Sequence, residues 1–152
     1  NMARAPKGGD TDQIKAVASG ECGVALTNTY YLARIIKSSK PEDRAVVERV
    51  KVVFPNQGTT GTHVNIAGAA VAKHAKNRDN AVVFMEYLAS PFAQDYFANG
   101  NNEFPAAKGV SVANPAIKAM GGDKFKAEQI PLGVVAKNLT KVQQMLDRVG
   151  FK

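Results

Sequence analysis

The amino-acid sequence predicts an α/β fold, in which short buried strands alternate with amphipathic helices. Short apolar runs are bounded by glycine, proline or polar turn residues, which is typical of buried strands. Between them, apolar residues recur at helical spacing behind residues that cap helices. Apolar residues make up 45% and charged residues 22% of the 152 positions, which is the composition of a folded protein. No apolar run approaches the roughly 20 residues that span a bilayer.

The first predicted helix is followed by the first predicted strand. Thr11 or Asp12 can cap the helix, and Ile14 opens its series of apolar positions at helical spacing. Gly20 then supplies a left-handed helix end. The apolar run at residues 22–26 is expected to be a buried strand.

Two further helices and two further strands follow from local signals. Asn28 or Thr29 is expected to cap a helix over residues 30–37. Pro41 opens another helix as a first-turn proline, with two acidic residues at its positive end. Residues 50–54 read as a strand, and a polar glycine-bearing loop leads to a strand-like run at 63–71.

The second half of the chain is predicted to be mainly helical. Asn77 can cap a helix over residues 81–89, and Ser90 with its following proline starts another. Asn114 with its proline begins a short helix. The closing helix is expected over residues 139–149, where apolar residues share one face.

The formal net charge of +7 raises nucleic-acid binding as a possible function. A nucleic-acid-binding face gathers cations and aromatics or carries a known reading motif. Here the cations are spread along the chain, no run is longer than two, and no zinc-finger spacing occurs. We therefore expect no nucleic-acid partner, while an attraction for small anions stays open.

The cysteine and the histidines give no clear sign of chemistry. Cys22 lies in an apolar run, so it is read as a buried thiol, with a partner in a longer chain as the alternative. His63 and His74 lack the spacing of a zinc pair, and structural roles are expected for both. No nucleophile and base can be assembled from the spacing, so the chain is not expected to be an enzyme.

The adjacent Tyr30 and Tyr31 are the candidate metal ligands. They occupy the first turn of a predicted helix, where free N–H groups and positive potential favour anions such as phenolate. A phenol has a pKa near 10, so a trivalent hard cation is needed to make two phenolates favourable at neutral pH. Hard oxygen ligands suit Fe(III). The alternative is that the two rings simply pack at a strand–helix junction.

The segments before and after the tyrosine pair favour metal ligation over simple packing of the two rings. In chain order the informative segments are residues 9–14 (GDTDQI), 20–25 (GECGVA), 28–31 (NTYY), 40–43 (KPED), 54–57 (FPNQ), 61–68 (GTHVNIAG) and 90–94 (SPFAQ). In this order, from about residue 8 to about residue 110, they resemble the periplasmic ferric ion-binding proteins of bacterial ABC importers. The tyrosine pair lies where that family carries its ligand signature.

The resemblance implies a solute-binding protein of the type II, venus-flytrap kind, which closes on iron between two lobes. Tyr30 and Tyr31 would each give a phenolate oxygen to Fe(III). Asn28 matches a position that helps to hold a synergistic anion such as carbonate or phosphate, although it is equally an ordinary helix cap. The implied partner is an inner-membrane ABC permease, the implied location is the periplasm, and the expected state is a monomer.

The resemblance also implies that the chain is a fragment, mostly the C-terminal lobe. Residues 1–60 and 106–152 would belong to the C-terminal lobe, and residues 62–105 would belong to the N-terminal lobe. The opening segment, residues 1–6, is neither a translation start nor a signal peptide, which fits a chain that lacks an N-terminal half. The remaining iron ligands of the family, a tyrosine in one branch and histidine with glutamate in another, come from that upstream half.

Two other functions stay open. A binding protein of the same fold could take an organic ligand or an oxyanion, with the tyrosines as walls that stack or donate hydrogen bonds. An enzyme could use Tyr30 or Tyr31 as a general acid, but the sequence offers no partner base.

Overall fold

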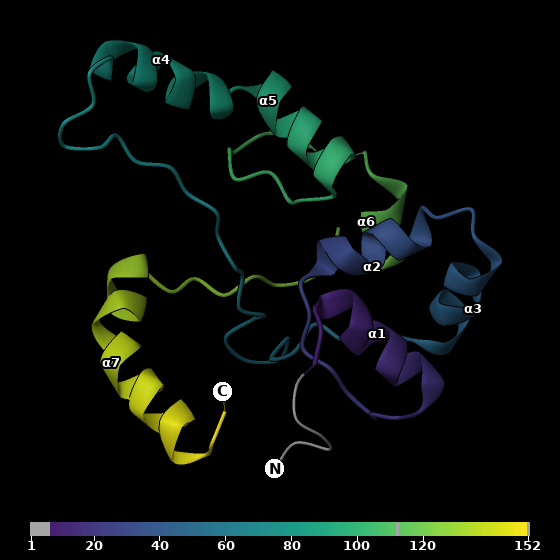
Figure 1. Ribbon diagram of the computed structural model, residues 1–152. Coiled ribbons are helices and arrows are strands. Elements are labelled where there is room, and N and C mark those ends of the chain that lie inside the picture. Colours follow the sequence, from purple (N-terminus) through teal and green to yellow (C-terminus); the bar gives the residue numbers. More distant parts are fainter. Residues whose placement is uncertain (1–6, 112, 152) are drawn as a thin grey trace. The chain divides into compact units, whose positions relative to one another are not determined.

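The computed structural model describes residues 7–111 and 113–151, so the opening segment 1–6 lies outside the described residues. Within the described ranges the chain forms seven α-helices and one π-helical turn. In chain order they are α1 (Asp10–Ser19), α2 (Thr29–Ile36), α3 (Pro41–Arg49), α4 (Arg78–Leu88), α5 (Pro91–Tyr96), the π-helical turn η1 (Phe97–Asn101), α6 (Pro115–Ala119) and α7 (Leu132–Arg148), as labelled in Figure 1. None of these helices has the length and apolar character that a membrane span requires.

The predicted helix boundaries are confirmed where a proline or glycine marks them. Gly20 ends α1 in the left-handed conformation with φ 82°, and Pro41 is in the first turn of α3. Ser90 caps α5, because its Oγ accepts from the Ala93 N–H at 3.3 Å. The closing helix α7 begins earlier than predicted, directly after Pro131.

The predicted strands are not paired in this structure. The runs at 22–26, 50–54 and 63–71 form no ladder, and the described residues hold one isolated parallel bridge, between Thr62 and Ala127. A strand is stable only when a neighbour satisfies its N–H and C=O groups, and these runs have none among the described residues. Several of their apolar side chains are open to solvent: Val24 is 84%, Leu26 93% and Val53 76% exposed.

The chain divides into two compact units. One contains Lys7–Val53 and Asn65–Lys124, and the other contains Phe54–Val64 and the chain from Phe125 onward. The predicted assignment of residues to a C-terminal and an N-terminal lobe stays a prediction.

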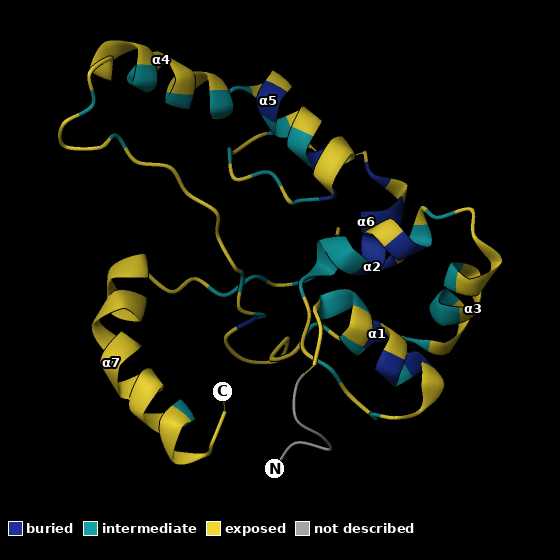
Figure 2. Cartoon of the chain, in the orientation of Figure 1, coloured by how far each residue is buried: buried dark blue, intermediate teal, exposed yellow. Residues whose placement is uncertain are grey.

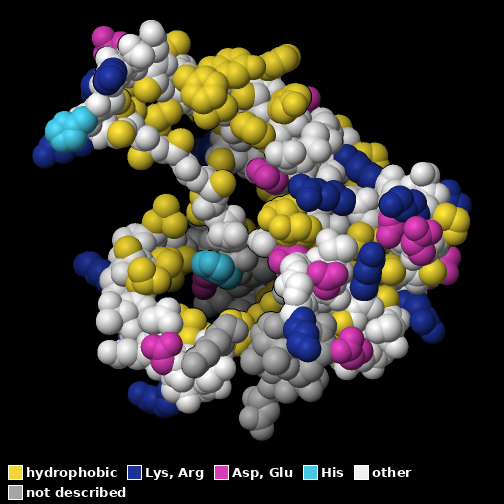
Figure 3. Space-filling view, viewed as in Figure 1, with side chains coloured by type: hydrophobic (Ala, Val, Ile, Leu, Met, Phe, Trp, Pro, Cys, Tyr) yellow, Lys and Arg dark blue, Asp and Glu magenta, His cyan; other side chains and the backbone are white. Residues whose placement is uncertain are grey.

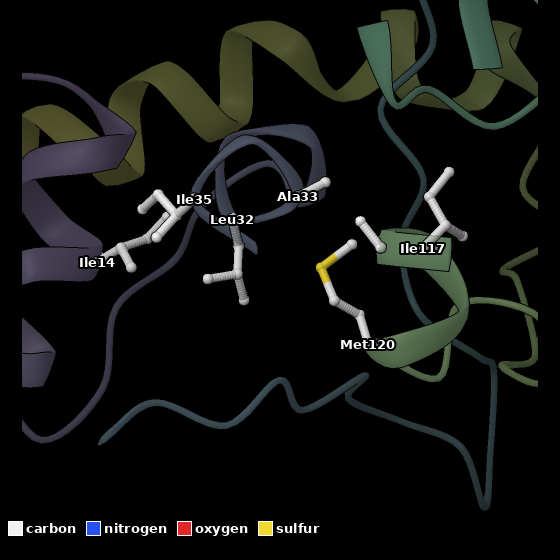
Figure 4. Packing of buried hydrophobic residues seen from close by; sticks show 7 residues of the cluster. Ile14, Leu32, Ala33, Ile35, Ile117 and Met120 are labelled. Carbon is white, nitrogen blue, oxygen red and sulfur yellow. The ribbon is translucent and has the colours of Figure 1, made fainter. Parts of the chain in front are cut away.

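The buried core of the larger unit is formed by α1, α2 and α6. Its members are apolar residues at the inward positions of these helices: Ile14, Leu32, Ala33, Ile35, Ala116, Ile117 and Met120. Figure 4 shows Ile14 approaching α2 from one side and Met120 from the other, and Figure 2 shows the buried positions gathered in these helices. Burial of the Leu32, Ala33 and Ile35 side chains fixes which face of α2 turns inward. The position of α2 therefore depends on apolar packing rather than on its short length.

A buried asparagine joins α6 to the turn that follows α5. Asn114 caps α6, because its Oδ1 accepts from the Ala116 N–H at 3.0 Å, and its Nδ2 donates to the Ala98 carbonyl at 2.8 Å and to Asn102 Oδ1 at 2.9 Å. Every polar group of this buried side chain is thus used. The predicted helix start at Asn114 is confirmed.

A glutamine side chain helps to join the two segments of the smaller unit. Gln57 behaves like a short piece of strand: its Oε1 accepts from the Lys126 N–H at 2.7 Å, and its Nε2 donates to the Lys126 carbonyl at 3.0 Å. Gly61 adopts φ 94° beside this join, and a Cβ there would lie 2.7 Å from the Lys126 carbonyl oxygen. The Phe54 and Phe125 rings stack 4.5 Å apart.

Candidate metal centre

The two predicted tyrosine ligands lie at the start of α2. Asn28 precedes the helix with an extended backbone (φ −75°, ψ 142°), and its carbonyl accepts the Tyr31 N–H at 3.3 Å. Because the next residues of α2 turn into the core, Tyr30 and Tyr31 are held in the first turn at the edge of that core. Both rings are partly exposed, so a ligand can reach their hydroxyl groups.

The two phenols are neighbours. The ring centroids lie 4.4 Å apart at an interplanar angle of 36°, although adjacent residues on a helix point about 100° apart. The structure therefore brings the two phenol rings together in the first turn of α2.

The surroundings of Tyr30 work against ionisation when no cation is present. The pKa of Tyr30 is raised from its ordinary value of 10.0, first by the hydrogen bond with Tyr31 and then by desolvation, while the negative charge of Asp10 adds to the rise and Arg34 opposes it. At neutral pH Tyr30 consequently holds its proton. A cation that binds this oxygen has to displace the proton, so its affinity should increase with pH.

Arg34 is a neighbour of both phenols that was not predicted from the sequence. Its guanidinium carbon lies 5.4 Å from the ring centroid of Tyr30 and 5.4 Å from that of Tyr31. The signal for it was present in the sequence, because residues three and four positions apart lie on the same helix face. The site thus combines two phenols with one fixed positive charge.

Asn28 occupies the N-cap position of α2, as predicted, but its side chain makes no capping hydrogen bond. Asp10 Oδ2 instead accepts from the Asn28 backbone N–H at 2.7 Å and from Asn28 Nδ2 at 3.1 Å, and Asn65 Nδ2 donates to Asn28 Oδ1 at 3.3 Å. The N-cap of α1 is Gly9 and not Thr11 or Asp12, so that prediction is wrong; Asp12 is the third residue of α1, and its carboxylate accepts from the Gly9 N–H at 2.8 Å. The predicted contact of Asn28 with an anion stays a prediction.

The histidines and the cysteine belong to no metal-binding cluster among the described residues. His63 Nδ1 is 2.9 Å from Glu128 Oε2, a contact within the smaller unit. Within residues 7–111 and 113–151, no three side chains of His, Cys, Asp or Glu are grouped so that they could hold a metal ion. The tyrosine oxygens are therefore the candidate ligands.

Comparison with known proteins identifies the family of the chain. The family model for bacterial extracellular solute-binding proteins matches residues 2–123. Iron uptake protein A2 of Synechocystis is 44% identical over the whole chain, which covers 44% of that protein. The chain thus spans about half the length of the curated relatives it matches.

Solved structures give the fold. A Trichodesmium IdiA (FutA) structure in complex with iron and citrate superposes with a TM-score of 0.90 at 49% identity, covering 100% of this chain and 47% of the other. A ferric binding protein from Campylobacter jejuni superposes with a TM-score of 0.89 at 40% identity, covering 100% of this chain and 47% of the other. The fold is therefore part of a two-lobed, type II periplasmic binding protein. On these matches, the chain belongs to the bacterial extracellular solute-binding proteins.

Proposed function

We propose that this chain is part of the substrate-binding component of an iron(III) ABC importer, which binds Fe(III) through the phenolate oxygens of Tyr30 and Tyr31. The observation that carries the proposal is the pairing of these two phenols, with ring centroids 4.4 Å apart, in the first turn of α2. Phenolate oxygens are hard ligands and match a hard trivalent cation. The relatives are iron-uptake and ferric-binding proteins.

The donor set fits iron as cargo rather than as a permanent cofactor. Two phenolates leave most of an octahedral shell open, so further ligands have to come from the part of the relatives' length that this chain does not span. Iron held between two parts of a protein can be released when they separate. Delivery to an inner-membrane permease, a periplasmic location, a monomeric state and the absence of catalysis all belong to this proposal.

An anion beside the iron is also part of the proposal. By the resemblance to the family, a negative group would lie at Asn28, the residue before the first turn of α2, either carbonate or phosphate from solution or a carboxylate of the chain itself. Helix N-termini attract negative charge because their first N–H groups have no partner within the helix.

Iron binding through the pair is tested by visible spectroscopy. Addition of Fe(III) to the chain is expected to produce a phenolate-to-iron charge-transfer band. Tyr30→Phe and Tyr31→Phe should each weaken the band, and the double substitution should abolish it, while both rings and their packing remain. Tyr87→Phe and Tyr96→Phe, on α4 and α5, are the matched controls and should leave the band unchanged.

Two outcomes would overturn the proposal. One is the absence of any band in the unsubstituted chain, and the other is a band that survives the double substitution. Calorimetric titration with Fe(III)-citrate, phosphate, sulfate and polyamines separates the alternative, because heat with an oxyanion or organic ligand alone would indicate a binding protein for that ligand.

A further inference from the structure

The start of α2 already carries a negative charge supplied by the chain itself. Asp10 is the first residue of α1, is half-buried and lies 18 positions before Asn28. One of its carboxylate oxygens, Oδ2, accepts both the Asn28 backbone N–H at 2.7 Å and Asn28 Nδ2 at 3.1 Å. The carboxylate thus occupies the backbone N–H and one of the two side-chain N–H groups of Asn28, which an anion from solution would otherwise use.

The geometry of these contacts is that of a bound anion. Hydrogen bonds to a carboxylate are short and roughly twice as strong as those between neutral groups. The positive end of a helix macrodipole stabilises such a charge. An open depression of about 310 Å³, lined by Asp10, Leu26, Thr27 and Asn28, lies over the carboxylate. A small anion could therefore reach this position if the carboxylate were absent.

The orientation of Asn28 is fixed from its other side. Asn65 Nδ2 donates to Asn28 Oδ1 at 3.3 Å, so the Asn28 amide has its oxygen toward Asn65 and its nitrogen toward Asp10. The backbone of Asn28 leads directly into the two tyrosines. A change at Asp10 is therefore transmitted to the first turn of α2 through one residue.

We propose that Asp10 is a positioning residue for the tyrosine pair, whose carboxylate serves as a resident anion at Asn28 in place of one taken from solution. The inference rests on the proposed function and deepens it, because it names the negative group that accompanies the iron. Its consequence is that the chain binds Fe(III) without added carbonate or phosphate. Removal of the carboxylate should make the same binding depend on an anion in the buffer.

The first test is rescue of Asp10→Ala by formate, the smallest carboxylate. Loss of a group that orients metal ligands typically weakens metal affinity by about 10–100-fold, and a loss of this size is expected for Asp10→Ala. Formate in large excess should restore the charge-transfer band in Asp10→Ala and leave the unsubstituted chain unchanged. Asp10→Asn keeps an oxygen acceptor, so it should retain more of the affinity and respond less to formate.

Asp12→Ala is the matched control. Asp12 lies on the same turn of α1 and bonds the Gly9 N–H, but it makes no hydrogen bond to Asn28. Damage to α1 alone should therefore appear in Asp12→Ala as well, without any rescue by formate. Equal responses of Asp10→Ala and Asp12→Ala to formate would overturn the inference.

The second test needs no metal. In nuclear magnetic resonance spectra of the iron-free Asp10→Ala chain, formate should shift the backbone and side-chain amide signals of Asn28 in a saturable way. The same titration of the unsubstituted chain and of Asp12→Ala should leave these signals in place. An Asn28 signal that shifts equally in all three chains would contradict a resident anion.

The outcomes for the two proposals can be told apart. If the unsubstituted chain gives no charge-transfer band, the proposed iron function fails, whatever the Asn28 signals show. If the band forms but Asp10→Ala leaves it unchanged, or if the unsubstituted chain needs added carbonate or phosphate, only the role of Asp10 fails.

Discussion

Helices α2 and α7 show how differently two amphipathic helices of one chain can be stabilised. Helix α2 has eight residues and buries three of them, Leu32, Ala33 and Ile35. Helix α7 has 17 residues, all of them described, and buries none. Length and apolar content therefore do not decide burial here, because a helix is buried only where another element covers its apolar face.

The apolar residues of α7 follow the spacing of a buried helix, but most of them are exposed to solvent. The residues predicted to share one face are Val142, Met145, Leu146 and Val149; Leu146 is half-buried, whereas Val142, Met145 and Val149 are 46%, 54% and 73% exposed. The aromatic residues of α4 and α5 are also exposed, and Figure 3 shows apolar side chains gathered over these helices. The relatives are about twice as long as this chain. We expect the remaining part of a relative-like protein to cover these faces.

The largest expected effect contrasts the two helices directly. Leu32→Ala removes a 9% exposed side chain from the core and should lower the free energy of unfolding by about 2–5 kcal/mol. Leu139→Ala, at a 67% exposed position of α7, should change it by less than about 0.5 kcal/mol. Urea unfolding of both variants, followed by circular dichroism, measures the difference. Similar losses would show that α7 is packed in solution and would remove the contrast.

A smaller effect is expected from two asparagines that precede helices. Asn114→Ala removes the cap of α6 and should cost about 0.5–2 kcal/mol of unfolding free energy. Asn77 precedes α4 without a side-chain capping bond, so Asn77→Ala should change stability by less than about 0.5 kcal/mol. Thermal unfolding of the two variants side by side gives the comparison. A larger loss for Asn77→Ala would mean that α4 is the better anchored helix.

The smallest effect concerns the exposed face of α2 and leaves the core untouched. Arg34 lowers the pKa of Tyr30, so Arg34→Gln should raise that pKa further. Iron binding requires loss of the phenolic proton and would then develop at higher pH. A pH titration of the charge-transfer band checks the shift, with Arg44→Gln on α3 as the control. A shift toward lower pH would contradict the assigned role of Arg34.

The sequence predicted the helix boundaries best where a residue acts on its own neighbours. Pro41, Ser90 and Asn114 each mark a helix start through a fixed φ or a local hydrogen bond, and all three starts are confirmed. The strands at 22–26 and 50–54 were wrong as paired elements, because pairing depends on a neighbour that local pattern cannot supply. The start of α7 was missed because Gly133 and two β-branched valines weaken the helical signal.

The candidate site likewise contains residues that local sequence patterns predict and contacts that they do not. The adjacency of Tyr30 and Tyr31 could be read directly from the chain, and Arg34 could have been read from helical spacing. The contact of Asp10 with Asn28 could not, because a hydrogen bond across 18 residues depends on how α1 and α2 pack together. Local patterns thus identify the ligands, whereas the groups that orient them become visible only in three dimensions.

The join between Gln57 and residue 126 has a consequence for sequence variation. Gln57 contacts the N–H and C=O groups of Lys126, which every residue except proline possesses. As far as the contact with Gln57 is concerned, position 126 is free to diverge among related proteins, although Lys126 Nζ also donates to the Thr59 carbonyl. Position 57 is not, since glutamate lacks the donor and a shorter amide would not reach. With respect to this pair of hydrogen bonds, substitutions should be tolerated much better at position 126 than at position 57.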